Sequence, residues 1–440
     1  MSKLNICVIG TGYVGLVTGT GLAEIGHSVI CCDINKEKID NLKNLIVPIY
    51  EQGLSEIFEK NVFAKRLSFS SNIEKSIRLS DIIFIAVGTP EKKSGEADIS
   101  AVKSVAKLIK HNLNKYKVIC VKSTVPLNTY NEINKIINNR NNRNKFDLVS
   151  NPEFLREGSS VKDFFWPDRI VIGTDSEKAF TIMENIYRPL YRRELPIVRC
   201  NIPTAIIIKY ASNSFLAVKV SFINEIASLC DTVNANISDV SKALGMDGRI
   251  SPKFLHPGPG YGGSCFPKDT KALVQMSKKN KANMKIVEAA IKSNKIQKRN
   301  VIQKLSNLLK DKYKNKNIAI FGLAFKAQTD DIRESSSIDL LKFLKNKNCN
   351  ITAYDPEASE NMKKFFPKVN YCDSWREAAI NADCIVIMTE WSEFRSIDIK
   401  ELSTLVRKKI ILDTRNIMNV SNLEKYKFSY DTIGAGKRIN

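Results

Sequence analysis

The feature that most constrains the fold is a glycine pattern that directly follows a short apolar segment near the N-terminus. Residues 4–10 read LNICVIG, which is typical of a strand buried in a parallel sheet. Gly10, Gly12 and Gly15 follow with the spacing G-x-G-x-x-G, and the next apolar segment, SVICC, ends before Asp33. Strand, glycine turn, helix and strand in this order predict the dinucleotide-binding unit of a doubly wound α/β fold.

Each residue type in this pattern has a role in binding a dinucleotide. The first glycine permits a tight turn, the second lets the backbone approach the pyrophosphate, and the third lets helix and strand pack closely. The helix N-terminus then faces the phosphates. Asp33, about twenty residues further on, can bind a ribose 2′-hydroxyl, and no arginine follows it directly. We therefore predict NAD rather than NADP as the cofactor; the alternative is a glycine turn without a ligand.

The alternation of strands and helices continues and then changes character in the middle of the chain. Further strands are predicted at 82–88, 117–124, 147–152 and 169–174. Residues 204–234 instead carry apolar side chains at helical spacing, and more helices are predicted from there to about Leu309. From Asn317 the strand, turn, helix and strand order returns, but only Gly322 lies at the turn.

These patterns predict an α/β protein with two Rossmann-like doubly wound parallel-sheet domains joined by a central helical domain. The predicted bounds are 1–200 for the NAD-binding domain, 201–310 for the helical domain and 311–440 for the second sheet domain. Because the glycine code is not repeated, the second sheet domain is predicted not to bind a dinucleotide in the same way. An extensive apolar helix in the middle can form core or a homodimer interface.

The composition excludes several classes of protein. In 440 residues, 43% are hydrophobic and 26% charged, which argues against collagen-like, coiled-coil and largely disordered chains. The net charge is +22, but the lysines are scattered and form no long basic block. We favour a positive field that attracts anionic ligands over a nucleic-acid or membrane surface. Apolar runs stay under ten residues and no secretory signal is evident, so we expect no membrane span.

The cysteines favour a reducing compartment. All ten lack the spacing of a disulfide framework, there is no C-x-x-C pair, and only three histidines occur. A zinc site is therefore not expected, and no metal is predicted. We predict a cytoplasmic protein.

Three segments carry candidate catalytic groups. NPEFLREG, at 151–158, holds Glu153 and Glu157, which would share one face if the segment were helical. Lys209 and Asn213 lie four residues apart on an apolar helix. Either the lysine extends along the helix to solvent, or the pair stabilises a developing oxyanion.

The third segment, GYGGSCFPKD at 260–269, places Cys265 just after paired glycines. A cysteine in a loop that a ligand can approach, near Lys268 and a helix N-terminus, can act as a nucleophile. The alternative is a buried structural thiol, which we assign to the other nine cysteines. GTP at 88–90 and KST at 122–124 follow predicted strands, where ligands bind in open α/β sheets.

Taken together, these motifs resemble the UDP-glucose/GDP-mannose dehydrogenase family over essentially the whole chain. The resemblance rests on ordered motifs that fit the family's spacing: GTGYVG, VGTP, KSTVP, NPEFLREG, KYASNSFLA, GMDGRI, FLHPGPGYGGSCFPKD, FGLAFK and TDDIRESSS. It implies a C-terminal domain that binds the nucleotide sugar. The family's usual DGRN pattern reads DTRN here, and Ser251 stands where a glycine often follows RI.

The resemblance also implies roles for individual residues. Cys265 corresponds to the catalytic nucleophile, Lys209 and Asn213 to an oxyanion-stabilising pair, and Asp269 to a group that takes part in proton transfer with an ordered water. Glu153 corresponds to the glutamate that assists thioester hydrolysis. The implied catalytic set is completed by a threonine that helps hold the water, Thr124.

Further residues are implied to contact ligands. The NAD contacts are Gly10, Gly12, Tyr13, Val14, Gly15, Asp33, Lys38, Thr89, Thr124, Glu157, Lys268 and Arg333. The substrate contacts are Glu153, Phe154, Leu155, Arg156, Lys209, Asn213, Arg249, Phe254, His256, Pro257, Gly258, Gly260, Tyr261, Gly262, Phe325, Lys326 and Arg415.

The implied reaction oxidises UDP-glucose to UDP-glucuronate, consuming two NAD+ per sugar through a covalent thiohemiacetal and thioester at Cys265. A sister enzyme acting on GDP-mannose or UDP-N-acetylmannosamine is the first alternative. A two-electron dehydrogenase that needs no cysteine is the second. A basic nucleic-acid-binding module is the third, and no recognition motif supports it.

Overall fold

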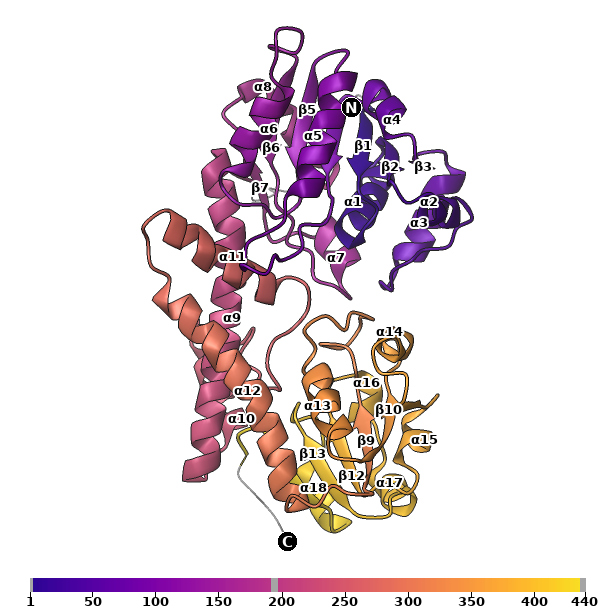
Figure 1. The fold of residues 1–440 in the computed structure, drawn as a ribbon, viewed down its shortest axis with the longest axis vertical. Helices are drawn as coiled ribbons and strands as arrows, with labels where there is room; N and C mark the ends of the chain where they lie inside the picture. The colour runs from indigo at the N-terminus through magenta and orange to yellow at the C-terminus, as the bar shows by residue number, and fades with distance from the viewer. Residues whose placement is uncertain (1–2, 191–196, 436–440) are drawn as a thin grey trace. The chain divides into compact units, whose positions relative to one another are not determined.

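The computed structural model describes residues 3–190 and 197–435, which divide into two compact units. Unit 1 contains the residues up to Ser212 together with Gln275–Lys281, and unit 2 contains Asn213–Val274 and the residues from Ala282 onward. Each unit is built around one sheet (Figure 1). Two sheets and a helical segment between them confirm the predicted fold class. The three-domain division at residues 200 and 310 stays a prediction.

The sheet of unit 1 places its first strand in the middle. The order is β3-β2-β1-β4-β5-β6-β7-β8, and neighbouring strands are parallel except β6 and β7. Because the strand order reverses at β1, the turn after β1 opens at the point where α/β sheets bind ligands. The strands are β1 (Asn5–Ile9), β2 (Ser28–Cys32), β3 (Leu67–Ser70), β4 (Ile82–Ile85), β5 (Lys117–Val121), β6 (Phe146–Ser150), β7 (Ile170–Gly173) and β8 (Ile197–Cys200).

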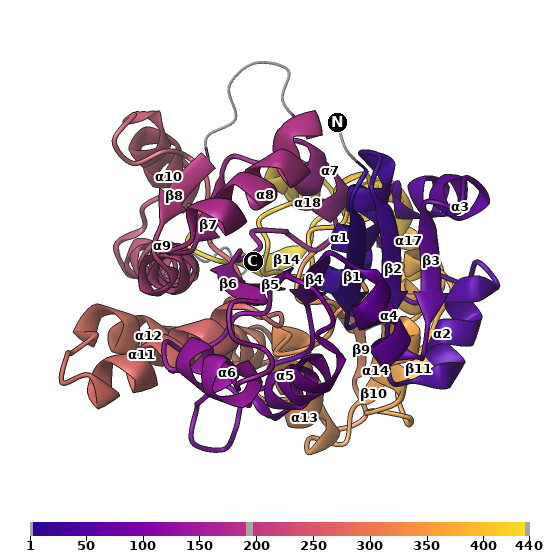
Figure 2. The same cartoon turned by 90° about the horizontal axis from the view of Figure 1, so that it is seen from above.

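Helices cover both faces of this sheet. One face carries α1, α3, α7 and α8, and the other carries α4, α5 and α6 (Figure 2). A second short helix, α2, follows β2, and a 3₁₀ turn follows α8. The bounds are α1 (Tyr13–Glu24), α2 (Lys36–Lys43), α3 (Leu54–Phe63), α4 (Ile73–Leu79), α5 (Ser100–Asn112), α6 (Thr129–Ile137), α7 (Ser160–Phe165), α8 (Glu177–Tyr187) and η1 (Arg188–Leu190).

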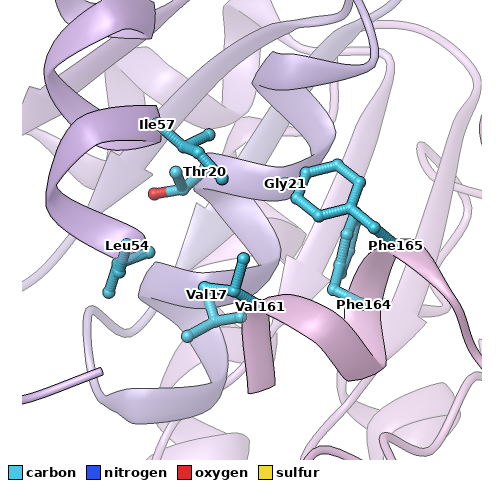
Figure 3. A pocket seen from close by; sticks show the side chains of 8 residues that line it. All are labelled: Val17, Thr20, Gly21, Leu54, Ile57, Val161, Phe164 and Phe165. Carbon is cyan, nitrogen blue, oxygen red and sulfur yellow. The ribbon is translucent and has the colours of Figure 1, made fainter. Parts of the chain in front are cut away.

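A small apolar pocket lies among α1, α3 and α7 (Figure 3). Two of its lining residues, Gly21 of α1 and Phe164 of α7, pack so closely that a Cβ atom at Gly21 would lie 2.3 Å from the Phe164 ring. Among the described residues that line it, Thr20 alone has a polar side chain, and none is charged. The pocket therefore belongs to the core of unit 1 and offers nothing that would bind a nucleotide.

The sheet of unit 2 has six strands in the order β11-β10-β9-β12-β13-β14, all parallel. Strand β9 lies between β10 and β12, as β1 lies between β2 and β4. The strands are β9 (Asn317–Phe321), β10 (Asn350–Tyr354), β11 (Asn370–Tyr371), β12 (Cys384–Ile387), β13 (Ile410–Asp413) and β14 (Ser429–Thr432).

One face of this second sheet packs on the long helices of the middle of the chain. Ile223 of α9, Ile237 of α10 and Leu305 of α12 share a core with Ile318 of β9 and Leu340 of α13. The opposite face carries α15, α16, α17 and α18. The bounds are α9 (Ile202–Val233), α10 (Ile237–Met246), α11 (Phe266–Lys279), α12 (Lys285–Leu309), α13 (Ser336–Lys345), α14 (Ser359–Lys363), α15 (Trp375–Ala379), α16 (Ser392–Arg395), α17 (Ile399–Leu405) and α18 (Val420–Lys425).

Helix α9 is an exception to the expectation that no segment is long and apolar enough to span a membrane. By length and composition it is apolar enough to cross a bilayer, although no single apolar run in it is long. Lys209 and Asn224 of this helix nevertheless make buried hydrogen bonds to Glu153 and Gly258 in loops. A helix that packs in the core of a globular protein can be equally long and apolar, so α9 by itself is weak evidence for a membrane span.

Candidate active site

The turn after β1 has the geometry that a dinucleotide phosphate requires. Gly10 has φ +101°, and a Cβ atom there would lie 2.7 Å from the Ala86 carbonyl oxygen. At Gly15 a Cβ atom would lie 1.8 Å from the Gly10 oxygen, so only glycine lets α1 pack on this turn. A Cβ atom at Gly12 would meet nothing within 4 Å. Since α1 begins at Tyr13, open space beside Gly12 adjoins a helix N-terminus.

Asp33 is held at the end of β2 by this same turn. Its Oδ2 atom accepts hydrogen bonds from the Thr11 N–H (3.0 Å) and hydroxyl (2.8 Å), and Oδ1 accepts one from the Asn35 N–H. Burial would raise the pKa of Asp33, but these hydrogen bonds and the charge of Lys38 outweigh burial and lower the pKa. An ionised carboxylate at the end of β2 is the group that a ribose hydroxyl requires, and the contact of Asp33 with NAD stays a prediction.

Glu51 is a residue of this region that sequence reasoning missed. Its side chain is buried and accepts hydrogen bonds from the Gly158 N–H (2.8 Å), the Ser160 N–H (2.7 Å) and the Tyr13 hydroxyl. It therefore connects the start of α1 to the turn that precedes α7, next to Glu157. A single glutamate in an irregular loop carries no spacing pattern, so only the structure could identify it.

The segment around Glu153 is not helical, contrary to one reading of its spacing. Residues 151–156 are irregular, so Glu153 and Glu157 do not share a helix face. Lys209 Nζ instead lies 2.9 Å from Glu153 Oε1 and donates to the Glu153 main-chain oxygen at 2.7 Å. Both side chains are more than nine-tenths buried. Lys209 therefore does not extend to solvent, and a buried ion pair faces the carboxyl edge of the sheet.

The environment keeps the Glu153 carboxylate charged. Burial would raise the pKa of Glu153, but the charge and hydrogen bond of Lys209, with help from the Leu155 N–H and from Lys122, lower it. Thr89 and Thr124 follow β4 and β5 at the same edge, where the Thr89 hydroxyl donates to the Thr124 carbonyl at 2.9 Å. The structure thus brings the two predicted turn motifs together in unit 1.

Phe154 and Arg156, which follow Glu153, each contact a charged residue. The Phe154 ring stacks under the Arg169 guanidinium, 3.5 Å from its centroid. Arg156 forms an ion pair with Asp163 at 2.5 Å and is exposed. These contacts fix the loop, and the expected substrate contacts of Phe154, Leu155 and Arg156 stay predictions.

Unit 2 holds the predicted nucleophile and its neighbours. Cys265 is partly exposed and directly precedes α11, so it lies at the positive end of the dipole of this helix. Asp269, one turn further, is buried and receives hydrogen bonds from Asn213 Nδ2 (2.7 Å) and Lys268 Nζ (2.8 Å). Each member of the predicted pair therefore binds a carboxylate of its own: Lys209 binds Glu153, and Asn213 binds Asp269.

Seven of the other nine cysteines are buried, but Cys200 and Cys349 are partly exposed, so the expectation of a buried thiol is wrong for these two. Desolvation nevertheless raises the pKa of both thiols. Cys31, Cys120 and Cys384 lie in strands and are fully buried, and burial raises the pKa of Cys120 to about 12. Such thiols stay protonated and unreactive at neutral pH. The contrast supports the choice of Cys265 among the ten.

Amide side chains clamp the glycine-rich loop that carries Cys265. The Gly258 N–H donates to Asn224 Oδ1 at 2.8 Å, and Gln297 Nε2 donates to the Gly258 oxygen at 2.8 Å. Asn294 bonds both the N–H and the carbonyl of Tyr261, at 2.8 and 3.0 Å. Sequence reasoning treated α9 and α12 as core and missed these amides, because one polar residue on an apolar face carries no pattern.

The same loop packs closely against Phe325 and Arg415. A Cβ atom at Gly263 would lie 2.8 Å from the Phe325 ring, and one at Gly258 would lie 3.3 Å from Arg415 Nη1. Arg415 also donates to the Phe325 oxygen at 2.8 Å. Thr414, where the family pattern has glycine, is buried and donates its hydroxyl to the Ile387 carbonyl. The structure thus accommodates this threonine and still places Arg415 at the glycine loop.

Aromatic rings lie beside the nucleophile, while two predicted arginines face acidic neighbours. Phe254 and Tyr261 both pack on Phe266, with ring centroids 6.0 and 6.1 Å away. Arg249 is 90% exposed and pairs with Asp247, and Arg333 pairs with Asp331. The ligand contacts expected of these arginines, and of Lys38, His256 and Lys326, stay predictions.

No metal centre appears in the part of the chain that the structure describes. Residues 3–190 and 197–435 contain no group of three or more His, Cys, Asp or Glu side chains placed to hold a metal ion.

Comparison with known proteins finds relatives over nearly the whole chain. Residues 4–191, 203–296 and 319–420 match the NAD binding, central and UDP binding domains of the UDP-glucose/GDP-mannose dehydrogenase family. UDP-glucose 6-dehydrogenase TuaD of Bacillus subtilis (strain 168) is 44% identical over 98% of this chain and 93% of its own length. UDP-glucose 6-dehydrogenase of Rhizobium meliloti (strain 1021) is 43% identical over 98% of this chain and 99% of its own length.

A solved structure agrees as well. A UDP-glucose dehydrogenase from the hyperthermophilic archaeon Pyrobaculum islandicum superimposes with a TM-score of 0.90 at 32% identity, covering 98% of each chain. The separate matches to all three domains and the identity over nearly full length point the same way: the chain belongs to the UDP-glucose/GDP-mannose dehydrogenase family.

Proposed function

We propose that this chain catalyses the NAD-dependent oxidation of UDP-glucose to UDP-glucuronate, a four-electron reaction at one carbon. The relatives that are 43–44% identical over nearly the whole chain carry the name of this activity. The structural observation that carries the proposal is a partly exposed Cys265 at a helix N-terminus, one turn from the buried Asp269. A dehydrogenase that stops at an aldehyde has no use for such a cysteine.

The open turn of unit 1 fits NAD. Gly12 leaves room beside a helix N-terminus, and Asp33 is ionised at the end of the neighbouring strand. When bound, NAD accepts a hydride from the substrate carbon in each of the two oxidation steps. The chain's own residues do the rest of the chemistry.

Cys265 links the two oxidations. The alcohol proton leaves to a base during the first step, and the Cys265 thiolate then adds to the aldehyde carbon, forming a thiohemiacetal. The second oxidation converts this adduct to a thioester. Water adds to the thioester carbon, the carbon–sulfur bond breaks, and Cys265 departs as a thiolate while the carboxylate forms. Each covalent species stays on the enzyme, so the aldehyde is not released.

The other buried groups have roles that follow from their charges. Lys209 and Asn213 lie four residues apart on α9, so both can face an oxyanion that develops on the substrate. Glu153 is ionised and can take a proton from the water that attacks the thioester. Asp269, held by Asn213 and Lys268, can exchange a proton through an ordered water.

Counting NADH tests this proposal. With limiting UDP-glucose and excess NAD+, we expect two NADH per sugar, measured by absorbance. Cys265→Ser should lose steady-state acid formation and still bind NAD. One NADH per sugar, or normal turnover by the serine variant, would remove the covalent step and favour a two-electron dehydrogenase.

The choice of sugar is tested in the same assay. UDP-glucose should give the highest kcat/KM among UDP-glucose, GDP-mannose and UDP-N-acetylmannosamine. A higher value for either of the other two nucleotide sugars would assign the chain to a sister activity of the family.

We also propose that the chain works as a homodimer in the cytoplasm. Phe215, Phe222 and Leu229 recur every seven residues along α9 and are 65%, 49% and 55% exposed. This spacing gives one apolar helix face, which a second copy of the chain could cover. Phe222→Glu should shift the wild-type dimer toward monomer in sedimentation velocity, and a monomeric wild type would contradict the proposal. The ten cysteines, none in a disulfide, support a reducing compartment.

A further inference from the structure

Two buried lysines flank strand β5, and the proposed mechanism uses neither. Lys117 begins the strand and Lys122 follows its end, and both side chains are more than nine-tenths buried. Lys122 Nζ lies 3.1 Å from Asn151 Oδ1 and 3.4 Å from the Asn151 main-chain oxygen. Burying an ammonium group costs free energy unless the group is paired, so the buried position of Lys122 requires an explanation.

The segment that Lys122 contacts, residues 151–153, provides this explanation. Asn151, Pro152 and Glu153 follow β6, and two ammonium groups bind this segment at alternate residues. Lys122 contacts the main-chain and side-chain oxygens of Asn151, and Lys209 contacts the main-chain and side-chain oxygens of Glu153. Because the proline between them fixes φ, the orientation set at Asn151 is passed to Glu153.

The rest of Asn151 is held as well. Its Oδ1 atom also accepts a hydrogen bond from the Tyr187 hydroxyl, its Nδ2 atom donates to the Val171 carbonyl at 2.8 Å, and its N–H donates to the Val121 carbonyl at 3.1 Å. Of these contacts, only the one from Lys122 brings a charge. Losing the ammonium would leave the asparagine in place by neutral bonds, but with its carbonyl oxygens less constrained.

The electrostatics of the cluster agree with a role at the site. Lys122 faces Glu153, Lys209 and the Cys120 thiol, and burial, reinforced by the charge of Lys209, lowers its pKa while Cys120 and Glu153 oppose that shift. Lys122 is among the groups that lower the pKa of Glu153. A second ammonium therefore helps to keep the Glu153 carboxylate ionised and paired with Lys209.

We propose that Lys122 is a positioning residue for thioester hydrolysis: through Asn151 it holds the Asn151–Glu153 segment so that the Glu153 carboxylate meets the attacking water. The inference rests on the proposed function. In the step concerned, water adds to the thioester carbon, its proton passes to Glu153, and the carbon–sulfur bond breaks to release Cys265 as a thiolate. Both hydride transfers precede this step and do not need Glu153 as a base.

The test compares Lys122→Met with a matched control, Lys117→Met. Both changes replace a buried lysine at an end of β5, but Lys117 binds the Ser80 and Arg78 carbonyls at the opposite end from Lys122. In a rapid-quench experiment with saturating UDP-glucose and NAD+, Lys122→Met should give a burst of two NADH per site. A steady state about 10- to 100-fold slower than wild type should follow, because a misplaced group costs about that much.

A second readout identifies the step. Acid-quenched Lys122→Met should carry a glucuronyl adduct on the Cys265 peptide by mass spectrometry. Its kcat/KM for UDP-glucose should stay close to wild type, because the slowed step follows both hydride transfers. Lys117→Met should lose stability in thermal denaturation without this adduct. An adduct in both variants, or in neither, would overturn the proposal, because a general loss of packing would not select one step.

A milder variant covers the case in which Lys122→Met does not fold. Tyr187→Phe removes only the hydroxyl that shares Asn151 Oδ1 with Lys122, so the same adduct should accumulate to a smaller extent. Its absence would overturn the proposal. Failure of the proposed function is distinguishable, since wild-type enzyme would then give one NADH per sugar in place of two.

Discussion

The two sheets begin with the same turn but use it differently. Gly10 and Gly322 directly follow β1 and β9 and have φ angles of +101° and +95°. They donate their N–H groups to the carbonyls of Cys32 and Tyr354 at 2.7 and 2.8 Å. In both turns the next N–H donates to an aspartate at the end of the neighbouring strand, Asp33 in one sheet and Asp355 in the other.

The two turns differ in how soon a helix begins after them. Helix α1 begins at Tyr13, three residues after Gly10, whereas α13 begins at Ser336, fourteen residues after Gly322. In the second turn the Ala324 N–H and the Trp391 indole N–H both donate to Asp355 Oδ2. Gly12 leaves space beside a helix N-terminus. In the turn after β9, by contrast, the main-chain N–H groups of Leu323 and Ala324 donate to Asp355. A glycine turn alone therefore does not make a dinucleotide site.

The strongest test of this comparison is to fill the open turn. Gly12→Val places a side chain where no atom lies within 4 Å, so the fold should tolerate it but the pyrophosphate should not. We expect the Kd for NAD to rise by about 100-fold or more, the effect of several kcal/mol of steric clash. Calorimetric titration measures the affinity, and a thermal melt close to wild type shows that unit 1 is intact.

The matched change in the second sheet is Gly322→Ala. A Cβ atom there would lie 2.4 Å from the Thr389 side chain at a positive φ angle. This variant should lose stability in unit 2 and keep wild-type affinity for NAD. Loss of NAD binding by Gly322→Ala, or unchanged binding by Gly12→Val, would contradict the assignment of the cofactor to the first turn.

The two aspartates sharpen the comparison further. Asp355 accepts hydrogen bonds from the Leu323, Ala324, Glu357 and Ala358 N–H groups as well as from Trp391. Asp355→Asn would turn an amide NH₂ toward some of these donors, so we expect a loss of about 2–4 kcal/mol of unfolding free energy. Urea denaturation measures this loss, and NAD affinity should not change.

Asp33→Asn should show the opposite profile. It removes the charged acceptor for a ribose hydroxyl, so NAD should bind about 10-fold more weakly, while the fold loses at most about 1 kcal/mol. Equal effects of the two substitutions on NAD affinity would mean that both turns serve the same ligand.

The smallest expected effect is a pH dependence that comes from Asp33. Its pKa is lowered in the folded chain, so its contribution to stability is present above the ordinary value of about 3.9 and is lost as the pH falls through the lowered pKa. The stability difference between wild type and Asp33→Asn should therefore shrink below about pH 4. Urea denaturation between pH 3 and 7 tests this, and a difference that grew toward acid pH would show that the sign is wrong.

Much of the fold could be predicted because it depends on local patterns. The apolar strands that end at Gly10 and Asp33, the long helix from Ile202 to Val233, and the second strand–turn–strand unit at Asn317 all follow from periodicity and turn residues. The segment from Asn151 to Arg156 could not be predicted in this way. The spacing of its residues allowed a helix. The structure shows an irregular segment, in which Glu153 makes a buried contact with Lys209, more than fifty residues away in the chain.

The sequence by itself therefore determined which residues could carry the chemistry: the glycines, Asp33, Cys265 and the lysine and amide on α9. Only the tertiary structure decided how buried charges are paired, for example that Lys209 meets Glu153 and that Asn213 meets Asp269. It also revealed the buried contacts of Glu51 and Asn224, which have no local pattern, and it paired Lys122 of the KST motif with Asn151. The physical reason is that periodicity reports burial along one element, whereas a buried polar group is satisfied by partners that only folding brings near.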